Sequence, residues 1–404
     1  MKKYVAILLA VCLMTTLLGC QTAPDNIPDT TAPTTAPTTA SPETPTETLP
    51  VAVPPTADQE PMISVSVPTV TETTSAQDGT VLFQYVYQTV SLTVPDPKVA
   101  DKIIVELLNR IDETMDAAES ILAMAQADYS AGSSWTPYLY RITYDPMRID
   151  SGVLSLFGSA VSFSGTPHPE QTYPSVSFDM VTGEVLTLPG ILAVDDTADA
   201  LCQYVLDSLA EIKDEKYLRE DYVSIVEDRF TGDLSGDTGW YFTPTGLCLY
   251  FIPYEIAPYS SGVVTAEVPY DLLPGVLADA YFPPERQDAT GEVLAAPFDV
   301  DALDSFSQFP EVVLESSGEK ILLYTRSAVY NLRLEVGSPA YSGGFAPDYT
   351  AFAAYSLTPG DALLVEADLP EDAPRLRLTY TSGDETVSLL LTKDADGAFM
   401  LEEE

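Results

Sequence analysis

The segment from residue 21 to about residue 77 most limits how this chain can fold, because it consists mainly of proline, threonine and alanine with scattered acids. Residues 31–40 nearly repeat the pattern Thr-Ala-Pro-Thr. Such a composition cannot bury enough apolar surface to offset the entropy lost on folding. Its prolines favour an extended polyproline II chain of about 3.1 Å per residue. We therefore predict a disordered tether through residue 77 and a folded part that begins at residues 78–80.

Ahead of this tether, Met1-Lys2-Lys3 gives a short basic start, and an apolar run follows from residue 4 to residue 18. The run is too short to cross about 30 Å of hydrocarbon, which takes about 20 helical residues. These features describe a signal peptide over residues 1–19. Because the segment ends in Leu-Leu-Gly-Cys20, it resembles the lipobox of bacterial lipoproteins, in which the cysteine receives diacylglycerol and becomes the new N-terminus.

The resemblance implies that residues 20–77 begin with a lipidated Cys20 and that the protein is anchored to the membrane through this lipid. We expect a location on the outer face of the cytoplasmic membrane, with the tether extending into the cell wall. An ordinary secretory signal that happens to end in cysteine is the alternative. No later stretch reaches 18 consecutive apolar residues, so we predict no transmembrane helix after the signal peptide.

The net charge of this chain is unusually negative for a protein of its size. It has 18 basic and 61 acidic residues, a formal net charge of −43. Such a surface repels nucleic acid and anionic lipid and attracts cations and basic proteins over long range. We therefore expect no nucleic-acid partner. An acidic exoprotein in which the sign of the charge has no functional meaning is the alternative.

Residues 78–285 mix strand and helix patterns. Asp96 and Pro97 supply an N-cap and a first-turn proline to a helix that is predicted to run to about Ala127. Further helices are predicted at 197–212, 216–228 and 270–280. Strands are predicted at 81–94, 138–144, 153–164, 176–180, 184–188, 240–242, 247–252 and 263–268. Without a regular β-α-β alternation, this order indicates an α+β domain.

Pro283-Pro284 and residues 287–291 mark a predicted domain boundary. Helical periodicity is nearly absent after residue 298. Short strands are predicted at 312–315, 320–325, 329–336, 351–357, 363–367, 376–380 and 387–392. Such a series is typical of a small β-sandwich, so we predict an all-β sandwich domain over residues 297–404 that folds independently of residues 78–285.

Three segments carry a family resemblance: Gly-Thr-Pro-His-Pro at 165–169, Phe-Asp-Met-Val-Thr-Gly at 178–183, and the segment 251–262, which contains Pro-Tyr-Glu-Ile-Ala-Pro-Tyr. In order and spacing they resemble the PdaC/RsiV-like family of extracytoplasmic domains from Gram-positive bacteria. That family has a small turn with glycine and histidine, an "FD…TG…L" hairpin, two helices and a "PYEIAPY…G" segment before its last strand. The resemblance covers residues 80–285 and implies an α+β fold.

The chain also departs from the family in ways that bear on function. RsiV-type proteins carry a cytoplasmic anti-sigma segment and a transmembrane helix, and their outer part binds lysozyme. We find neither feature here and do not expect the chain to hold a sigma factor. PdaC-type proteins continue into a polysaccharide deacetylase domain with metal-binding Asp and His residues, a set that the single histidine of this chain cannot supply. The resemblance therefore implies a sensing or binding module without its usual effector.

Residues 253–259 are the strongest candidate binding site. Pro253 and Pro258 stiffen the backbone, and Tyr254 and Tyr259 offer rigid amphipathic rings suited to a protein contact or to stacking on sugars. Glu255 is predicted to meet an arginine or lysine of a basic partner. In the alternative, this segment is a strand end whose tyrosines close the core.

His168, between two prolines, is predicted either to contact the ligand or to be a turn residue bonded to backbone. As the only histidine, it excludes a multi-histidine metal site. We find no Gly-x-Ser-x-Gly motif and predict no catalytic residue, no metal and no cofactor. Cys202 and Cys248 are predicted to be buried free thiols, with a disulfide between them as the alternative.

These observations favour a non-catalytic lipoprotein of the cell envelope, with lysozyme or another basic protein, or the peptidoglycan of the wall, as ligand. One alternative is a peptidoglycan-modifying enzyme with an acidic active site that we do not recognise. Another is a structural spacer protein. Binding of lysozyme or of purified wall separates the first hypothesis from the other two.

Overall fold

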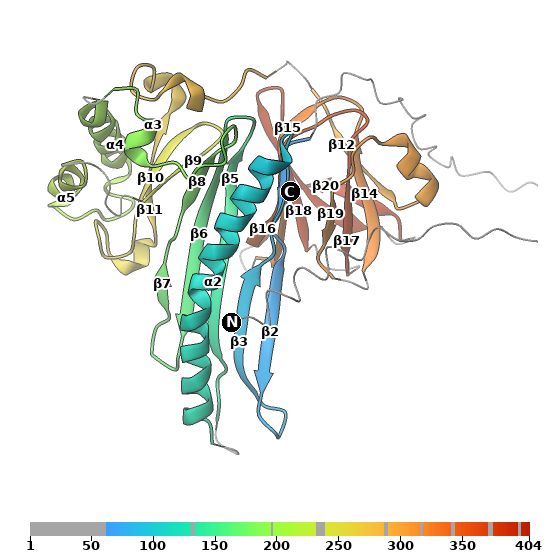
Figure 1. The fold of residues 1–404 in the computed structure, drawn as a ribbon, viewed down its shortest axis with the longest axis horizontal. Helices are drawn as coiled ribbons and strands as arrows, with labels where there is room; N and C mark the ends of the chain where they lie inside the picture. The colour runs from blue at the N-terminus through green and yellow to red at the C-terminus, as the bar shows by residue number, and fades with distance from the viewer. Residues whose placement is uncertain are drawn as a thin grey trace, which may run out of the picture. The chain divides into compact units, whose positions relative to one another are not determined.

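In the computed structural model, the structure describes residues 62–130, 134–194, 197–231, 239–286, 290–315, 318–340, 344–370, 375–394 and 397–404. The predicted signal peptide, Cys20 and most of the predicted tether lie outside these residues. The described elements are mainly strands with few helices (Figure 1). This agrees in broad terms with the predicted α+β domain followed by an all-β domain. None of the helices in the described ranges is both long and apolar enough to span a bilayer.

A six-stranded sheet and one long helix pack as two layers in the N-terminal part of the described chain. The strands are β2 (Thr69–Ser75), β3 (Val81–Gln88), β5 (Tyr138–Ile149), β6 (Val153–Phe163), β7 (Glu170–Thr172) and β8 (Val176–Asp179). Only β3 and β5 are parallel, and α2 (Pro97–Asp128) lies between them in the chain and packs along the sheet (Figure 1). Asp96 caps this helix by accepting a 2.9 Å bond from the Lys98 amide, as predicted. The buried residues of α2, among them Ile103 and Leu107, face the sheet core.

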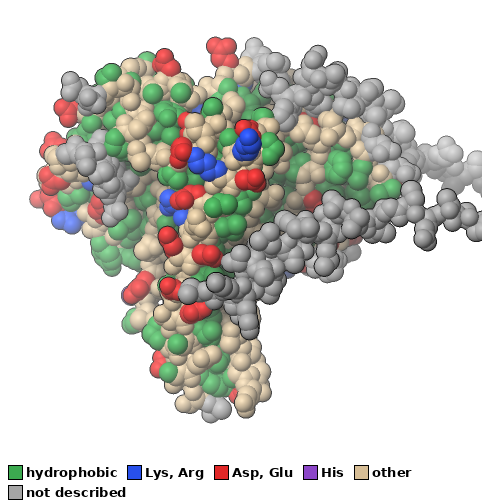
Figure 2. Space-filling model, in the orientation of Figure 1, with side chains coloured by type: hydrophobic (Ala, Val, Ile, Leu, Met, Phe, Trp, Pro, Cys, Tyr) green, Lys and Arg blue, Asp and Glu red, His purple; other side chains and the backbone are tan. Residues whose placement is uncertain are grey.

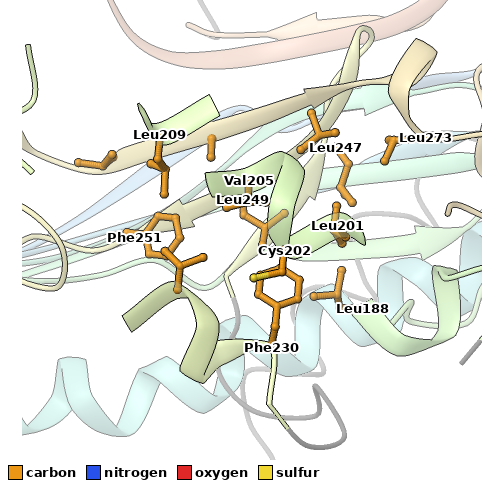
Figure 3. Packing of buried hydrophobic residues seen from close by; sticks show 14 of the residues in the cluster. Leu188, Leu201, Cys202, Val205, Leu209, Phe230, Leu247, Leu249, Phe251 and Leu273 are labelled. Atoms are coloured by element: carbon orange, nitrogen blue, oxygen red, sulfur yellow. The ribbon is translucent and has the colours of Figure 1, made fainter. Parts of the chain in front are cut away.

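A smaller three-stranded sheet follows, with strands β9 (Trp240–Phe242), β10 (Gly246–Phe251) and β11 (Val264–Pro269). The helices before it are α3 (Leu188–Ile191), α4 (Ala198–Ile212) and α5 (Tyr222–Arg229). Leucines and phenylalanines from helices and strands interdigitate in one core, and every residue of β10 is buried (Figure 3). This core fixes the loops at the end of β10 to the helices.

A buried ion pair connects β5 to this smaller sheet. Arg148 donates from Nε to Asp150 Oδ2 at 2.6 Å and from Nη1 to the Tyr270 hydroxyl and the Tyr281 carbonyl, both at 2.6 Å. Asp150 accepts the amides of Gly152 and Val153 through its other oxygen. Both charged side chains are almost fully buried, so each depends on the other for compensation of its charge.

Two sheets share the core of the C-terminal region. One has the order β12 (Val293–Pro297), β14 (Glu319–Thr325), β17 (Ala362–Ala367), β13 (Glu311–Val313). The other contains β15 (Val329–Pro339), β16 (Phe345–Leu357), β18 (Leu376–Ser382), β19 (Glu385–Lys393) and β20 (Phe399–Glu403). Leucine, valine and phenylalanine side chains from both sheets form one buried cluster, which is the packing expected of the predicted sandwich.

The larger of these sheets continues into the N-terminal part of the chain. Its order is β20-β19-β18-β15-β16-β1-β4, in which β1 is Ser64–Ser66 and β4 is Ser91–Thr93. The predicted tether over residues 20–77 therefore extends too far, because strands begin at Ser64 and β2 follows at Thr69. The apolar residues Met62, Ile63, Val65 and Val67 are buried and supply the surface that the preceding proline-rich stretch lacks.

Three other sequence predictions differ from the structure. Residues 270–280 do not form one helix but two 3-10 turns, η3 (Tyr270–Leu272) and η4 (Asp279–Tyr281), because Pro274 and Gly275 interrupt them and Gly275 has a φ of +78°. Residues 184–188 contribute only a single bridge between Phe178 and Val185. Strands β12 and β20 were not predicted. Two further 3-10 segments, η2 (Tyr259–Ser261) and η5 (Val300–Ser305), lie outside the sheets.

Candidate ligand-binding surface

The loop between β10 and β11, residues 252–262, contains the predicted binding segment. Its middle residues Ile256 and Ala257 are buried in the core described above. The Arg219 amide donates to the Ile256 carbonyl at 2.8 Å, and the Ser261 hydroxyl donates to the Lys216 carbonyl at 2.7 Å. The loop is therefore fastened to the segment between α4 and α5 at two points, and the residues between its anchors are held in fixed positions.

Tyr254 has an unusual backbone conformation for a large side chain. Its φ is +72°, in the left-handed region, and its amide donates to the Ala257 carbonyl at 3.0 Å in a tight turn. A non-glycine residue pays about 1–2 kcal/mol for this conformation. The side chain nevertheless remains 69% exposed, so burial of the ring does not offset this strain. Residues under such strain concentrate at binding and active sites.

Tyr259 lies beside Tyr254, and His168 lies beside Tyr259. The ring centroids of Tyr254 and Tyr259 are 5.6 Å apart, and those of Tyr259 and His168 are 6.2 Å apart. Tyr259 is 43% exposed, and His168 and Pro258 are exposed as well. The structure thus brings together four of the predicted site residues, and it rules out the alternative in which both tyrosines close the core.

A further tyrosine, Tyr217, was not predicted as part of the site. It also has a positive φ, +54°, and is 73% exposed. It lies between Lys216 and Arg219, whose backbone bonds fasten the 252–262 loop. Two of the three non-glycine residues with positive φ in the described part of the chain are therefore exposed tyrosines on adjoining segments. We call the exposed set Tyr217, Tyr254, Pro258, Tyr259 and His168 the tyrosine patch.

Glu255, predicted to meet a basic partner, is engaged inside the protein. Its carboxylate forms an ion pair with Arg229 and accepts the Ile252 amide at 3.0 Å. Arg229 in turn lies over the Phe251 ring, 4.4 Å from its centroid, and donates to the Tyr250 carbonyl. Both charged groups are largely buried, and Arg229 compensates the charge of Glu255. The Glu255 carboxylate therefore stabilises the loop from inside the protein.

Tyr173, which is close enough to Tyr259 to feel its charge, belongs to a cluster of aromatic rings. The ring of Tyr173 stacks on that of Phe157 at 5.8 Å, and the Tyr250 hydroxyl donates to the Tyr173 carbonyl. Burial raises the pKa of Tyr173, and the neighbouring phenol of Tyr259 adds to the effect. Tyr173 therefore connects the neighbourhood of Tyr259 with a cluster of packed aromatic rings.

The two cysteines of the folded part are free and buried, as predicted. Burial raises the pKa of the Cys202 thiol, and it raises that of the Cys248 thiol to about 12 from a usual value of 9.0. The thiolate is the nucleophilic form of cysteine, so burial disfavours the reactive form of both side chains. Within the described ranges, no three His, Cys, Asp or Glu side chains gather as a metal site.

Comparison with known proteins places part of this region in a family. Residues 189–271 match the family model described as "Protein of unknown function (DUF3298)". This similarity covers less than half of the chain. The match lies within residues 80–285, the range over which the PdaC/RsiV-like resemblance was predicted. No curated protein matches the chain.

Solved structures of the DUF3298 family also resemble the chain. A Bacteroides fragilis NCTC 9343 protein is 17% identical over 54% of this chain and 94% of its own, with a TM-score of 0.40. A Pseudomonas aeruginosa PAO1 protein is 18% identical over 54% of this chain and 98% of its own, with a TM-score of 0.39. The residues that match this family model include Tyr217 and the whole 252–262 loop, whereas His168 and Tyr173 precede them.

Proposed function

We propose that this chain is a non-catalytic, lipid-anchored protein of the bacterial cell envelope, and that the tyrosine patch binds a basic protein such as lysozyme. The membrane attachment would be through Cys20, on the outer face of the cytoplasmic membrane. The observation that carries the binding role is Tyr254, a strained residue whose exposed ring lies beside that of Tyr259, which in turn neighbours His168.

Exposed tyrosines that are held rigidly are well suited to protein recognition. A tyrosine has few rotatable bonds, so its immobilisation on binding costs little entropy for the area that it buries. In the patch, backbone bonds on both sides of Tyr217 and the turn at Tyr254 reduce that cost further. Binding-energy hot spots are enriched in tyrosine for the same reason.

Charge favours a basic partner. The net charge of −43 is spread widely, and acidic side chains are scattered over the face seen in Figure 2 while basic ones gather in a few places. The outer side of α2 is a clear case, with Asp112, Glu113 and Asp116 all exposed. Such a field speeds the association of a cationic protein, and salt screens it.

The test measures lysozyme binding kinetics with the purified mature chain at 0.01 M and 0.15 M salt. The Debye length falls from about 30 Å to about 8 Å over this range, so association should slow markedly. The double change Tyr254→Ala and Tyr259→Ala should raise the dissociation rate roughly thirtyfold, as expected for the loss of about 2 kcal/mol. The salt dependence of association should be the same for the double variant as for the unchanged protein.

The matched control is Asp112→Asn with Glu113→Gln on α2, which should slow association and leave dissociation unchanged. Dissociation that is unaffected by the double tyrosine change would remove the patch from the binding site. Absence of lysozyme binding at 0.01 M salt would reject lysozyme as the partner, and purified wall peptidoglycan, whose sugars can stack on tyrosine rings, would be the next ligand to test.

A further inference from the structure

We propose that strand β2 is a docking site for an extended, basic peptide segment, which adds to the sheet as a further strand. β2 is an outer strand of the six-stranded sheet, and with seven residues it is the longest outer strand of the described sheets. Figure 1 shows it beside β3, on the side away from β5. The proposal does not rest on the function of the tyrosine patch, because β2 and β7 lie at opposite edges of this sheet and His168 precedes β7.

Backbone groups of β2 point alternately toward β3 and away from it, as in any antiparallel pair. Just before the strand, the Pro68 carbonyl accepts the Thr89 amide at 3.0 Å. Just after the strand, the Ala76 amide donates to the Thr80 carbonyl at 2.8 Å. Since these two bonds fix the alternation, the even-numbered residues of β2 bond to β3 and the odd-numbered residues face outward.

Thr71 and Thr73 are the outward-facing residues in the middle of β2. Both are exposed, and no strand in the described ranges pairs with this side. The backbone of Thr69, the preceding outward-facing residue, is hydrogen-bonded to the Tyr349 phenol. Sheet edges are commonly protected against pairing by lysine, proline or a very short strand, and β2 has none of these. The amides and carbonyls of Thr71 and Thr73 are therefore oriented to pair with an added strand.

The one charged residue of β2 is Glu72, and it lies on the face of the sheet that α2 covers. Its exposed carboxylate accepts a 3.0 Å bond from the Tyr87 hydroxyl. Tyr85, which lies opposite Glu72 on β3, shares a hydrogen bond with Thr114 of α2. Burial raises the pKa of Tyr85, and the negative charges of Glu72 and Asp112 add to the effect. The carboxylates of Glu72 and of Asp112 on α2 therefore act on the same ring.

Asp112 begins a line of exposed acids on α2, which continues with Asp116 and Glu119 on the same side of the helix. Every second side chain of a strand added to β2 would lie on this face, beside Glu72. Basic side chains at those positions would be attracted and acidic ones repelled. A second copy of this chain would bring the same acids to the contact, so the charge favours a basic peptide over self-association.

The experiment measures binding of a synthetic peptide in which valine and lysine alternate, with blocked ends and the seven-residue length of β2, to the purified mature chain at low salt. Hydrogen exchange identifies the site. With excess peptide, exchange at the amides of Thr71 and Thr73 should slow about tenfold or more, because each amide gains an acceptor.

Two variants at one position test whether the backbone carries the binding. Thr71→Pro removes an outward amide and no bond to β3, so the sheet should form and the affinity for the peptide should fall about tenfold. Thr71→Val keeps this amide, and as the matched control it should bind the peptide as the unchanged chain does. Glu72→Gln should lower the affinity and reduce its salt dependence.

A peptide with the same side chains but with every backbone amide N-methylated keeps the charge and loses the donors. It should leave exchange at Thr71 and Thr73 unchanged, and it gives the same comparison on the unchanged chain if the Thr71→Pro variant does not fold. Equal binding of the two peptides, without slower exchange at Thr71 and Thr73, would overturn the proposal, because attraction to the acids alone would then explain the binding.

Two other results would also overturn it. One is the absence of peptide binding at low salt. The other is slow exchange at Thr71 and Thr73 without peptide, together with a dimer in analytical ultracentrifugation that the Thr71→Pro change dissociates. In that case the occupant of the edge would be a second copy of this chain.

Discussion

Replacing Tyr254 separately by glycine and by alanine would test whether the strain at this position is real and whether it serves binding. Both changes remove the ring, so both lose the same partial packing and the same ligand contact. They differ in that alanine, like tyrosine, pays for a φ of +72°, whereas glycine does not. The glycine variant should therefore be more stable than the alanine variant by about 1 kcal/mol.

The assay is chemical denaturation of the two variants under identical conditions, with the midpoint converted to a free energy of unfolding. Tyr217, with a φ of +54°, provides an independent repeat of the same pair of changes. Both Tyr254 variants should lose lysozyme affinity to the same extent, while Val181→Ala, at another highly exposed site, should not. An alanine variant at least as stable as the glycine variant would refute the reasoning from strain.

Three further predictions concern the anchor, the buried ion pair and pH. Cys20→Ser should move the protein from the membrane fraction to the soluble fraction, because no other anchor is predicted, and fractionation with immunoblotting checks this. Asp150→Ala should destabilise the fold by about 3–5 kcal/mol, since it leaves the buried Arg148 without its partner; a change below 1 kcal/mol in denaturant would contradict this. Between pH 9 and pH 12 the temperature of the thermal unfolding midpoint should fall. Burial raises the folded-state pKa of Cys248 and of Tyr270 to about 12, so unfolding releases protons in this pH range. The stability that is present below pH 9 is therefore lost as the pH rises. A midpoint that stays constant to pH 12 would contradict the assignment.

Local signals in the sequence were sufficient for several elements. The Asp96-Pro97 start and the apolar spacing after it predicted α2, because capping and periodicity act within one helix. Strands β9 and β10 were predicted at 240–242 and 247–252, and they pair as neighbours. In contrast, the helix predicted at 270–280 was wrong, since Pro274 and Gly275 interrupt the chain more strongly than apolar spacing can compensate.

Strand β1 shows why the rest of the fold could not be predicted in this way. The alternation in Ile63-Ser-Val-Ser-Val67 is a strand pattern, but it directly follows a stretch whose composition is typical of disorder. The partners of Val65 lie 27 and 288 residues further along, at Leu92 and Ala353, and no local rule identifies them. The shared sheet that results was therefore not predicted.

Some residues of the candidate site could be predicted from the sequence, and others could not. The segment 253–259 and His168 were predicted from residue type, and the structure places Tyr254, Tyr259 and His168 side by side. Tyr217 was missed because its distinguishing property is a backbone angle, which its sequence neighbours do not reveal. The engagement of Glu255 by Arg229 depends on a helix 26 residues earlier, so it too required the fold.

Site-specific photo-crosslinking tests the binding surface most directly. A photoreactive phenylalanine analogue is placed at Tyr254, and in a second protein at Met124, which is exposed on α2 outside the tyrosine patch. Each full-length protein is illuminated with lysozyme at low salt. The proposed function predicts a crosslinked product from position 254 and none from position 124. Crosslinking from position 124 alone, or equally from both positions, would contradict recognition through the tyrosine patch.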